Sequence, residues 1–126
     1  MTAITVTLKN FTKEELTCTC GCKTYNYDTE FLIRLQAFRY VYNKGLKVTG
    51  PGRCKKHNAE VGGVPTSLHI CEGKAATAVD VVGGNELYIA ACNSKLFNEV
   101  IWYKNKGFVH LGLDRNQKGN FFSIKN

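Results

Sequence analysis

The sequence predicts an α+β fold in which helices flank a small antiparallel sheet. Helix-like and strand-like segments are mixed along the chain, but they do not alternate in the regular way that a doubly wound parallel sheet requires. Several of the strand-like segments are short, and one long amphipathic segment over residues 28–45 is typical of a helix. Together these observations favour a few packed elements around one core.

The size and composition of the chain are those of one domain, residues 1–126. Of its residues, 44% are hydrophobic and 21% are charged, which is typical of a globular protein. No apolar run reaches the roughly 18 residues that a membrane-spanning helix needs. The N-terminus has no basic stretch followed by an apolar one, so we expect no signal peptide and synthesis in the cytoplasm.

The chain carries a formal net charge of +7. Such a charge favours polyanionic partners, for example nucleic acid, anionic lipid or an acidic cell-wall polymer. The lysines are scattered, and basic residues are not interleaved with aromatic ones in the manner that stacks bases. A solvated basic surface is the plainer interpretation, and we expect neither a nucleic-acid nor a membrane partner.

The first half of the chain predicts two helices. Residues 3–8 alternate apolar and polar side chains, as a strand does. A short helix follows, with Thr12 as its N-cap and Glu15 as its capping-box partner. The main helix begins near Asp28 and ends at Gly45. Its apolar face recurs at three- and four-residue steps: Phe31, Leu35, Phe38 and Tyr42.

The second half predicts further strands and helices. Residues 54–61 fit one or two turns of helix. Residues 85–92 and 94–107 are typical of one broken helix or of two, the second capped by Ser94 and stopped at Gly107. Short strands are expected at residues 46–50, 76–82, 108–113 and 120–124.

Six cysteines are present, and three of them lie in the stretch TCTCGC, at Cys18, Cys20 and Cys22. In a chain without a signal peptide, thiols or metal ligands are more natural than disulfides. The spacing C-x-C-x-C is not a standard zinc-finger spacing. A second metal site and a disulfide stay open there, while reduced, partly buried thiols are favoured.

Ionisable residues interrupt two apolar strands, and this predicts a metal site. Asp80 lies within residues 76–82, where a carboxylate is costly unless it is paired or metal-bound. His110 interrupts residues 108–113, and neighbouring strands would place both side chains on one face. With His69 they offer two imidazoles and a carboxylate, which suit a hydrolytic zinc site with one position open for water. The alternative is an ordinary core histidine and a salt-bridged aspartate.

The stretch GRCKKHNAEVGG…SLH…GKAA…D, followed by GFVHL, resembles the zinc peptidases of the D-Ala-D-Ala carboxypeptidase and L-alanyl-D-glutamate endopeptidase family. The resemblance runs from about Phe11 to about Leu113. It implies a zinc D-Ala-D-Ala-peptidase-like (hedgehog-like) fold. The residues that match the family's S-x-H-x-x-G-x-A motif and its C-terminal metal histidine are Ser67, His69, Gly73, Ala75 and His110.

The resemblance also implies roles for individual residues. Arg53 is the implied catalytic residue, because the family has an arginine there that binds the substrate carboxylate or stabilises the developing oxyanion. His57 matches a histidine of the family that we interpret as structural. The implied zinc ligands are His69, Asp80 and His110.

The chain departs from the family pattern in its spacing. The family's aspartate usually follows its histidine by seven residues, whereas Asp80 follows His69 by eleven. We interpret the difference as a loop insertion, with Cys71 as a reserve ligand. The family's SGYR is replaced by TGPGR, so the loop that presents Arg53 can have another shape.

The general base is a further departure. Many members place a carboxylate or a histidine two to four residues before the last metal histidine, but residues 106–108 offer neither. The base therefore stays unassigned among Asp114, Glu72 and Glu99.

The leading hypothesis is a monomeric zinc metallopeptidase that hydrolyses peptidoglycan stem peptides. It would act on the cell wall after release, as a phage endolysin does, or as part of a virion. The alternative is a non-catalytic zinc-containing module on the same fold that binds peptidoglycan or a protein. A nucleic-acid-binding domain is supported by charge alone. The choice between carboxypeptidase and endopeptidase does not follow from the sequence.

Overall fold

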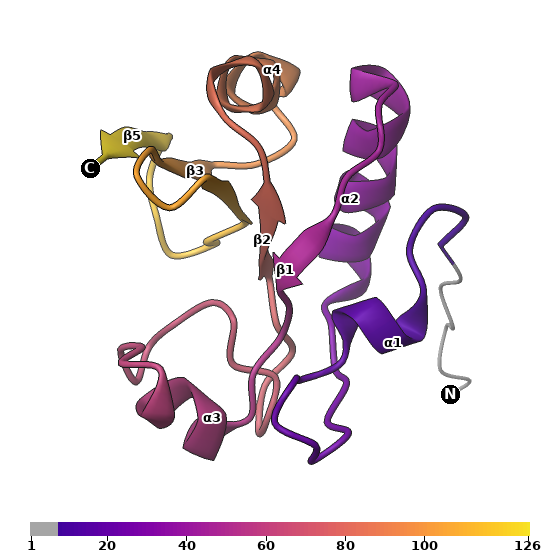
Figure 1. Cartoon of the computed structure of the whole chain (residues 1–126), viewed down its shortest axis with the longest axis vertical. Helices are drawn as coiled ribbons and strands as arrows, with labels where there is room; N and C mark the ends of the chain where they lie inside the picture. Colours follow the sequence, from indigo (N-terminus) through magenta and orange to yellow (C-terminus); the bar gives the residue numbers. More distant parts are fainter. Residues whose placement is uncertain (1–7) are drawn as a thin grey trace.

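The computed structural model describes residues 8–126, so the strand expected at residues 3–8 lies outside the described residues apart from Leu8. Helices and strands are mixed in this part of the chain, which is the predicted α+β class (Figure 1). The helices are α1 (Lys13–Leu16), α2 (Thr29–Tyr42), α3 (Lys55–Glu60) and α4 (Asn85–Ser94). The strands are β1 (Val48–Gly50), β2 (Ala78–Val82), β3 (Glu99–Tyr103), β4 (Phe108–Gly112) and β5 (Phe121–Lys125).

The five strands of the described chain form one sheet in the order β1-β2-β4-β3-β5. The pairs β1–β2, β2–β4 and β4–β3 are antiparallel, as predicted. Strand β5 instead pairs with β3 in parallel, so the expectation of an antiparallel sheet is wrong at this edge. The reason is the connection: β4 reverses the chain, and residues 113–120 reverse it again before β5.

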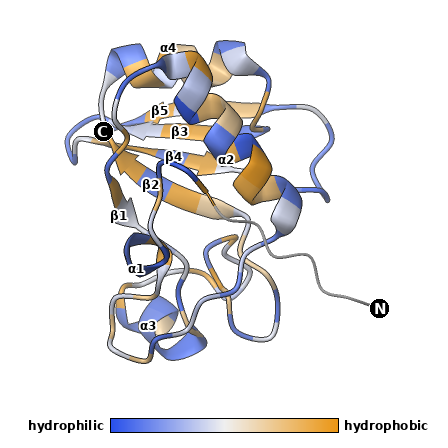
Figure 2. Ribbon diagram, turned by 90° about the vertical axis from the view of Figure 1, so that its right-hand side faces the viewer, coloured by the Kyte–Doolittle hydropathy of each residue, from blue (hydrophilic) through white to orange (hydrophobic). Residues whose placement is uncertain are grey.

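Helices α2 and α4 cover one face of the sheet (Figure 2). Because side chains alternate along a strand, every second residue of the central strands faces these helices. The strand residues that join this core are fully buried: Val79, Val81, Val100, Val109 and Leu111. Helix α2 contributes Phe31, Leu35 and Phe38, which are also fully buried and lie on the predicted apolar face.

The predicted caps of the first two helices are confirmed. Thr12 and Glu15 form a capping box on α1, and Asp28 accepts a hydrogen bond from the Phe31 N–H at the start of α2. The end of α2 was predicted too late. The helix ends at Tyr42 because Asn43 takes the left-handed conformation (φ 56°), a role that the sequence analysis gave to Gly45.

The prediction of a helix over residues 94–107 is wrong. Ser94 is the last residue of α4 rather than the cap of a new helix. Residues 99–103 read EVIWY, and such β-branched and aromatic side chains suit a pleated surface, where they form β3. Gly107 stops no helix; it has φ 73° in the turn from β3 to β4.

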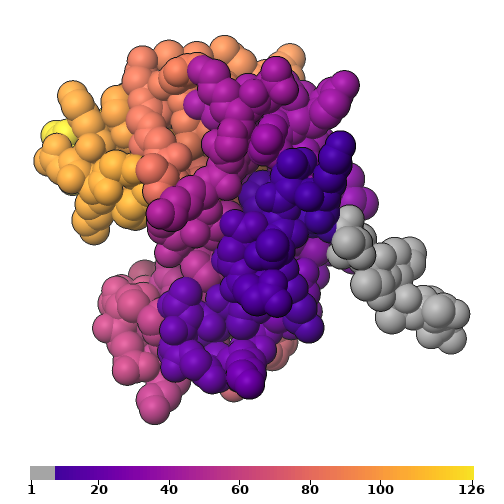
Figure 3. All heavy atoms as spheres, turned by 45° about the vertical axis from the view of Figure 1, so that its right-hand side comes forward, coloured from indigo at the N-terminus to yellow at the C-terminus, as the bar shows by residue number. Residues whose placement is uncertain are grey.

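Below the sheet, two stretches that are distant in sequence lie side by side (Figures 1 and 3). The loop that follows α1 lies against α3 and its neighbouring loops. Tyr27 joins the two stretches, because its hydroxyl donates to the Leu16 carbonyl and accepts from the Gly52 N–H. Among the helices of residues 8–126, none combines the length and the apolar character needed to cross a membrane.

Candidate metal centre

A row of residues crosses the sheet on the face opposite to α2 and α4. Asp80 on β2 lies directly across from His110 on β4, and Gly50 on β1 lies across from Asp80 on its other side. The two ionisable side chains therefore share a face, as predicted. A Cβ at Gly50 would lie 2.8 Å from the Asp80 Cβ, so the glycine leaves the space that the aspartate side chain occupies.

The loop between α3 and β2 brings His69 to this row. Its Nε2 lies 3.2 Å from Asp80 Oδ1 and 3.2 Å from His110 Nδ1. His110 Nδ1 in turn lies 3.1 Å from the same carboxylate oxygen. The loop is held by the backbone of Arg53, whose main-chain N–H donates to the His69 carbonyl oxygen (2.7 Å). His69, Asp80 and His110 thus form a group that could hold a metal ion.

Hydrogen bonds on the outer sides of both rings determine which nitrogens carry protons. His69 Nδ1 lies 3.2 Å from the carbonyl oxygen of Pro51, which can only accept, so this nitrogen donates. His110 Nε2 lies 2.7 Å from Glu99 Oε1 and donates to that carboxylate. In the neutral rings, His69 Nε2 and His110 Nδ1 then carry lone pairs. Metal-bound histidines are usually oriented by a carbonyl or a carboxylate in this way.

Two lone pairs and a carboxylate oxygen therefore converge on one point, and they repel one another unless a cation lies among them. A tetrahedral zinc ion with bonds of about 2.0–2.1 Å to nitrogen and oxygen separates its ligands by about 3.3 Å. The three separations, 3.1 to 3.2 Å, are close to this value. The donor set and its geometry fit zinc, with one coordination position left for water or substrate.

In the absence of a metal ion, a proton can serve as this cation. Burial alone lowers the pKa of His110, but hydrogen bonds to Asp80 and Glu99 outweigh burial and raise the pKa to about 9. Burial also opposes ionisation of Asp80, yet its hydrogen bonds with His110 and His69 hold the pKa of its carboxyl well below the usual range. Burial lowers the pKa of His69, which favours the neutral ring.

The three residues line a hollow of about 660 Å³, and Arg53 lines the same hollow. The Arg53 Nη1 atom donates to Asn58 Oδ1 at 2.9 Å, and Asn58 is itself buried and donates to the Val64 carbonyl. A Cβ at Gly63 would lie 2.7 Å from Arg53 Nη1. Asn58 and Gly63 therefore position the guanidinium beside the histidine–aspartate group.

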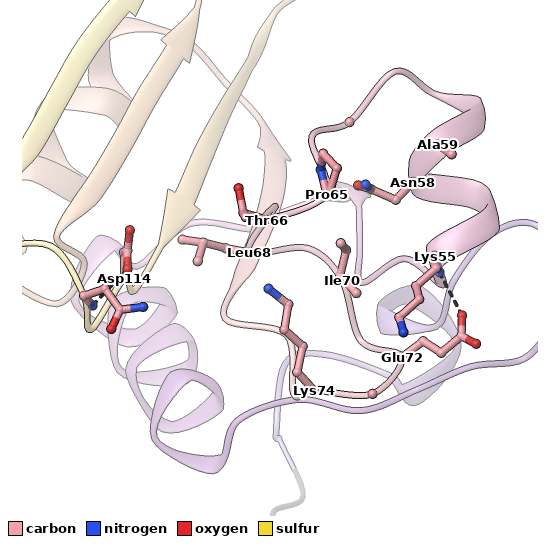
Figure 4. Close-up of a pocket in the computed structure, with 13 residues that line it drawn as sticks. Lys55, Asn58, Ala59, Pro65, Thr66, Leu68, Ile70, Glu72, Lys74 and Asp114 are labelled. Atoms are coloured by element: carbon pink, nitrogen blue, oxygen red, sulfur yellow. Dashed lines mark hydrogen bonds between the residues drawn. The ribbon is translucent and has the colours of Figure 1, made fainter.

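A second hollow, of about 800 Å³, shares part of its lining with the first and is drawn in Figure 4. Apolar side chains of Leu68 and Ile70 and the cationic side chains of Lys55 and Lys74 lie around it. The two hollows share four lining residues, Gly63, Thr66, Leu68 and Asp114. The two hollows are therefore neighbours on the surface of the protein.

A family model described as Peptidase M15 matches residues 9–112. The chain belongs to the peptidase M15 family. This confirms the resemblance drawn from the sequence motifs, and it supports a hydrolase that cleaves peptide bonds. M15 metallopeptidases generally depend on zinc, which agrees with the donor set of the group. No curated protein matches the chain.

The structure brings the four predicted site residues into one hollow: Arg53, His69, Asp80 and His110. The other candidates lie elsewhere or at its margin. Cys71 packs against Gly52, outside the metal-binding group, and Glu72 lines only the second hollow. His57 lines neither hollow, and its Nε2 lies 3.3 Å from Thr19 Oγ1.

The contact between Glu99 and His110 was not predicted. Glu99 was one of three candidates for the base, and the sequence analysis placed it in a helix. As part of β3, it lies two residues from Ile101, which is the direct partner of His110. Correct assignment of that strand would have placed Glu99 on the face of the metal-binding group.

Proposed function

We propose that the protein is a zinc-dependent peptidase that hydrolyses peptide bonds in peptidoglycan stem peptides. The observation that carries this proposal is the convergence of His69 Nε2, Asp80 Oδ1 and His110 Nδ1 at 3.1 to 3.2 Å in the wall of an open hollow. Zinc bound there would polarise the scissile carbonyl and lower the pKa of a water molecule. The proposal includes a zinc D-Ala-D-Ala-peptidase-like fold.

The side chains around the group orient its rings, stabilise charge on the substrate and move the proton in this proposal. Pro51 and Glu99 orient the two imidazole rings from outside. Arg53, held by Asn58, offers a planar pair of donors to the oxyanion that develops on the substrate carbonyl or to a substrate carboxylate. Besides Asp80, the carboxylates that line the hollow are Glu99 and Asp114, and these are the candidates for moving the proton.

The charges around both hollows favour an acidic, extended peptide. Lys55 and Lys74 line the second hollow, and Arg53 and Lys106 line the first. Stem peptides carry free carboxylates, and their length suits two adjoining hollows. The net charge of +7 also favours approach to an anionic wall polymer, which is consistent with a phage endolysin role.

The test is zinc content together with hydrolysis of purified peptidoglycan, followed as newly released amino groups. Asp80→Asn keeps the shape of the side chain but removes its charge, and we expect it to lose both zinc and hydrolysis. Asp28→Asn, in the cap of α2, is the matched control and keeps both. Hydrolysis by Asp80→Asn at the rate of the unmodified protein would refute the proposal.

A second candidate is a non-catalytic module that binds peptidoglycan or a protein. It is favoured by the lack of a carboxylate or histidine at residues 106–108 and by the use of Glu99 in orienting His110. Zinc bound at His69, Asp80 and His110 without any hydrolysis of peptidoglycan would establish this candidate in place of the peptidase.

A further inference from the structure

Four cysteine sulfurs converge below the sheet, apart from the histidine–aspartate group. They belong to Cys18, Cys20 and Cys22, in the loop after α1, and to Cys54, the N-cap of α3. All four Sγ atoms lie within 4.8 Å of one another. The sequence showed the first three as a cluster but Cys54 as an isolated residue, and the fold adds the fourth.

We propose that Cys18, Cys20, Cys22 and Cys54 bind a structural zinc ion. A zinc ion with four thiolates at about 2.3 Å separates the sulfurs by about 3.8 Å. The Sγ separations are 3.6 Å for Cys18–Cys20, 3.6 Å for Cys20–Cys54 and 3.9 Å for Cys18–Cys54. A disulfide needs about 2.05 Å. These three separations are close to the value expected around a shared ion and too long for a disulfide, and the Cys22 Sγ lies within 4.8 Å of the other three sulfurs.

The backbone of the loop after α1 is shaped to aim its sulfurs at one point. In an extended strand, Cys18 and Cys22 would lie about 13 Å apart, since a strand rises about 3.3 Å per residue. Here the loop turns back on itself, with Gly21 at φ 92° and Lys23 at φ 60°. The Cys18 N–H donates to the Thr24 carbonyl at 3.0 Å and closes the turn.

Backbone N–H groups point at three of the four sulfurs. Cys18 Sγ accepts from the Cys54 N–H, Cys54 Sγ from the His57 N–H, and Cys22 Sγ from the Thr24 N–H, each at 3.4 Å. Such bonds stabilise negative charge on a ligand sulfur and orient it. Lys23 directly follows Cys22 in sequence, and its charge would offset part of the negative charge of four thiolates around a divalent ion.

Four protein ligands leave no open position, so this site is structural rather than catalytic. The position of the four-cysteine site in the fold indicates what it would stabilise. Cys54 directly follows Arg53, whose backbone pairs with His69 and Cys71. A zinc ion at the four cysteines would tie the loop after α1 to the segment that presents Arg53, in a part of the protein where the described chain has only short helices and loops.

The two sites can be tested separately by counting zinc atoms in full-length variants. Cys20 and Cys22 are exposed, so Cys20→Ser/Cys22→Ser leaves the apolar core intact. We expect this variant to hold one zinc ion fewer than the unmodified protein and to keep the ion at His69. Asp80→Asn should lose the other ion and keep the cysteine-bound one. Cys92→Ser removes a cysteine outside the cluster and should lose neither.

Cobalt gives a second readout, which can be recorded on the unmodified protein first. Cobalt bound to thiolates absorbs strongly in the near ultraviolet, and the four-cysteine site predicts this band in the cobalt-loaded protein, with its loss in Cys20→Ser/Cys22→Ser. Absence of the band in the unmodified protein would overturn the proposal. A disulfide between two cysteines of the cluster, seen as a mass lower by two hydrogens and located by peptide mapping, would overturn it too.

Discussion

His69 Nε2 and His110 Nδ1 lie 3.2 Å apart, and the opposite nitrogen of each ring donates a hydrogen bond away from the pair. Two residues 41 positions apart in sequence thus direct lone pairs at each other beside a carboxylate. The arrangement is unfavourable by itself and becomes favourable around a cation.

Glu99 is expected to act by positioning His110. Glu99→Ala removes the acceptor for His110 Nε2 and should weaken zinc binding about 10- to 100-fold. Glu99→Gln keeps an acceptor oxygen and should recover part of the affinity. Zinc competition titration measures both, with Glu86→Ala on α4 as the control. Normal zinc affinity combined with lost turnover in Glu99→Ala would instead make Glu99 the proton-transfer residue.

Gly50→Ala tests the packing beside Asp80. The new methyl group would meet the Asp80 side chain, 2.8 Å from its Cβ and 2.9 Å from its Cγ, and displace the carboxylate. A displacement of about 1 Å can cost about 100-fold in rate, and we expect a loss of that order in peptide hydrolysis. Gly45→Ala is the matched control, since its methyl group meets nothing within 4 Å. Equal activity of the two variants would contradict the prediction.

Arg53→Ala should lower kcat for peptide hydrolysis by about 100- to 1,000-fold, the cost of losing one donor to an oxyanion. Zinc content should not change, because Arg53 is outside the metal-binding group. Asn58→Ala removes the acceptor that holds Arg53 and should lower kcat by a smaller factor. Arg39→Ala on α2 serves as the control. Zinc loss in Arg53→Ala would show that the residue supports the fold of the site instead.

Because of the interactions of the Asp28 carboxylate, we expect the free energy of unfolding to depend on pH. Partial burial raises the pKa of its carboxyl, but hydrogen bonds from Arg115 (2.7 Å) and the Phe31 N–H (2.9 Å) outweigh burial and lower it. A carboxyl whose pKa is lower in the folded state stabilises the fold above its unfolded pKa of about 3.9. This contribution is lost as pH falls below about 4, through the folded pKa.

Urea unfolding across pH tests this prediction. At neutral pH, Asp28→Ala should lower the free energy of unfolding by about 1 kcal/mol, because the cap of α2 is lost. Asp28→Asn can still cap the helix and should cost less. The difference between Asp28→Asn and the unmodified protein should shrink below about pH 4. A difference that is constant over the whole range would refute the role of the ionised carboxyl.

Local patterns predicted most of the elements but not every end or pairing. The capping box at Thr12 and the apolar face of α2 depend on residues three or four apart, and both were predicted correctly. The strand at residues 99–103 was missed because a short apolar run beside a helix has no decisive period. The parallel pairing of β5 depends on which edge of the sheet is free, and no local pattern encodes that.

The sequence by itself determined the peptidase family, the α+β class and the residue types available for chemistry. The spacing from His69 to Asp80 departs from the family pattern, and only the register of β2 with β4 shows that Asp80 and His110 are direct partners. Tertiary structure alone placed Glu99 against His110 and Cys54 among the other cysteines. The physical reason is that a metal site depends on distances between atoms, which the fold sets and the spacing along the chain does not.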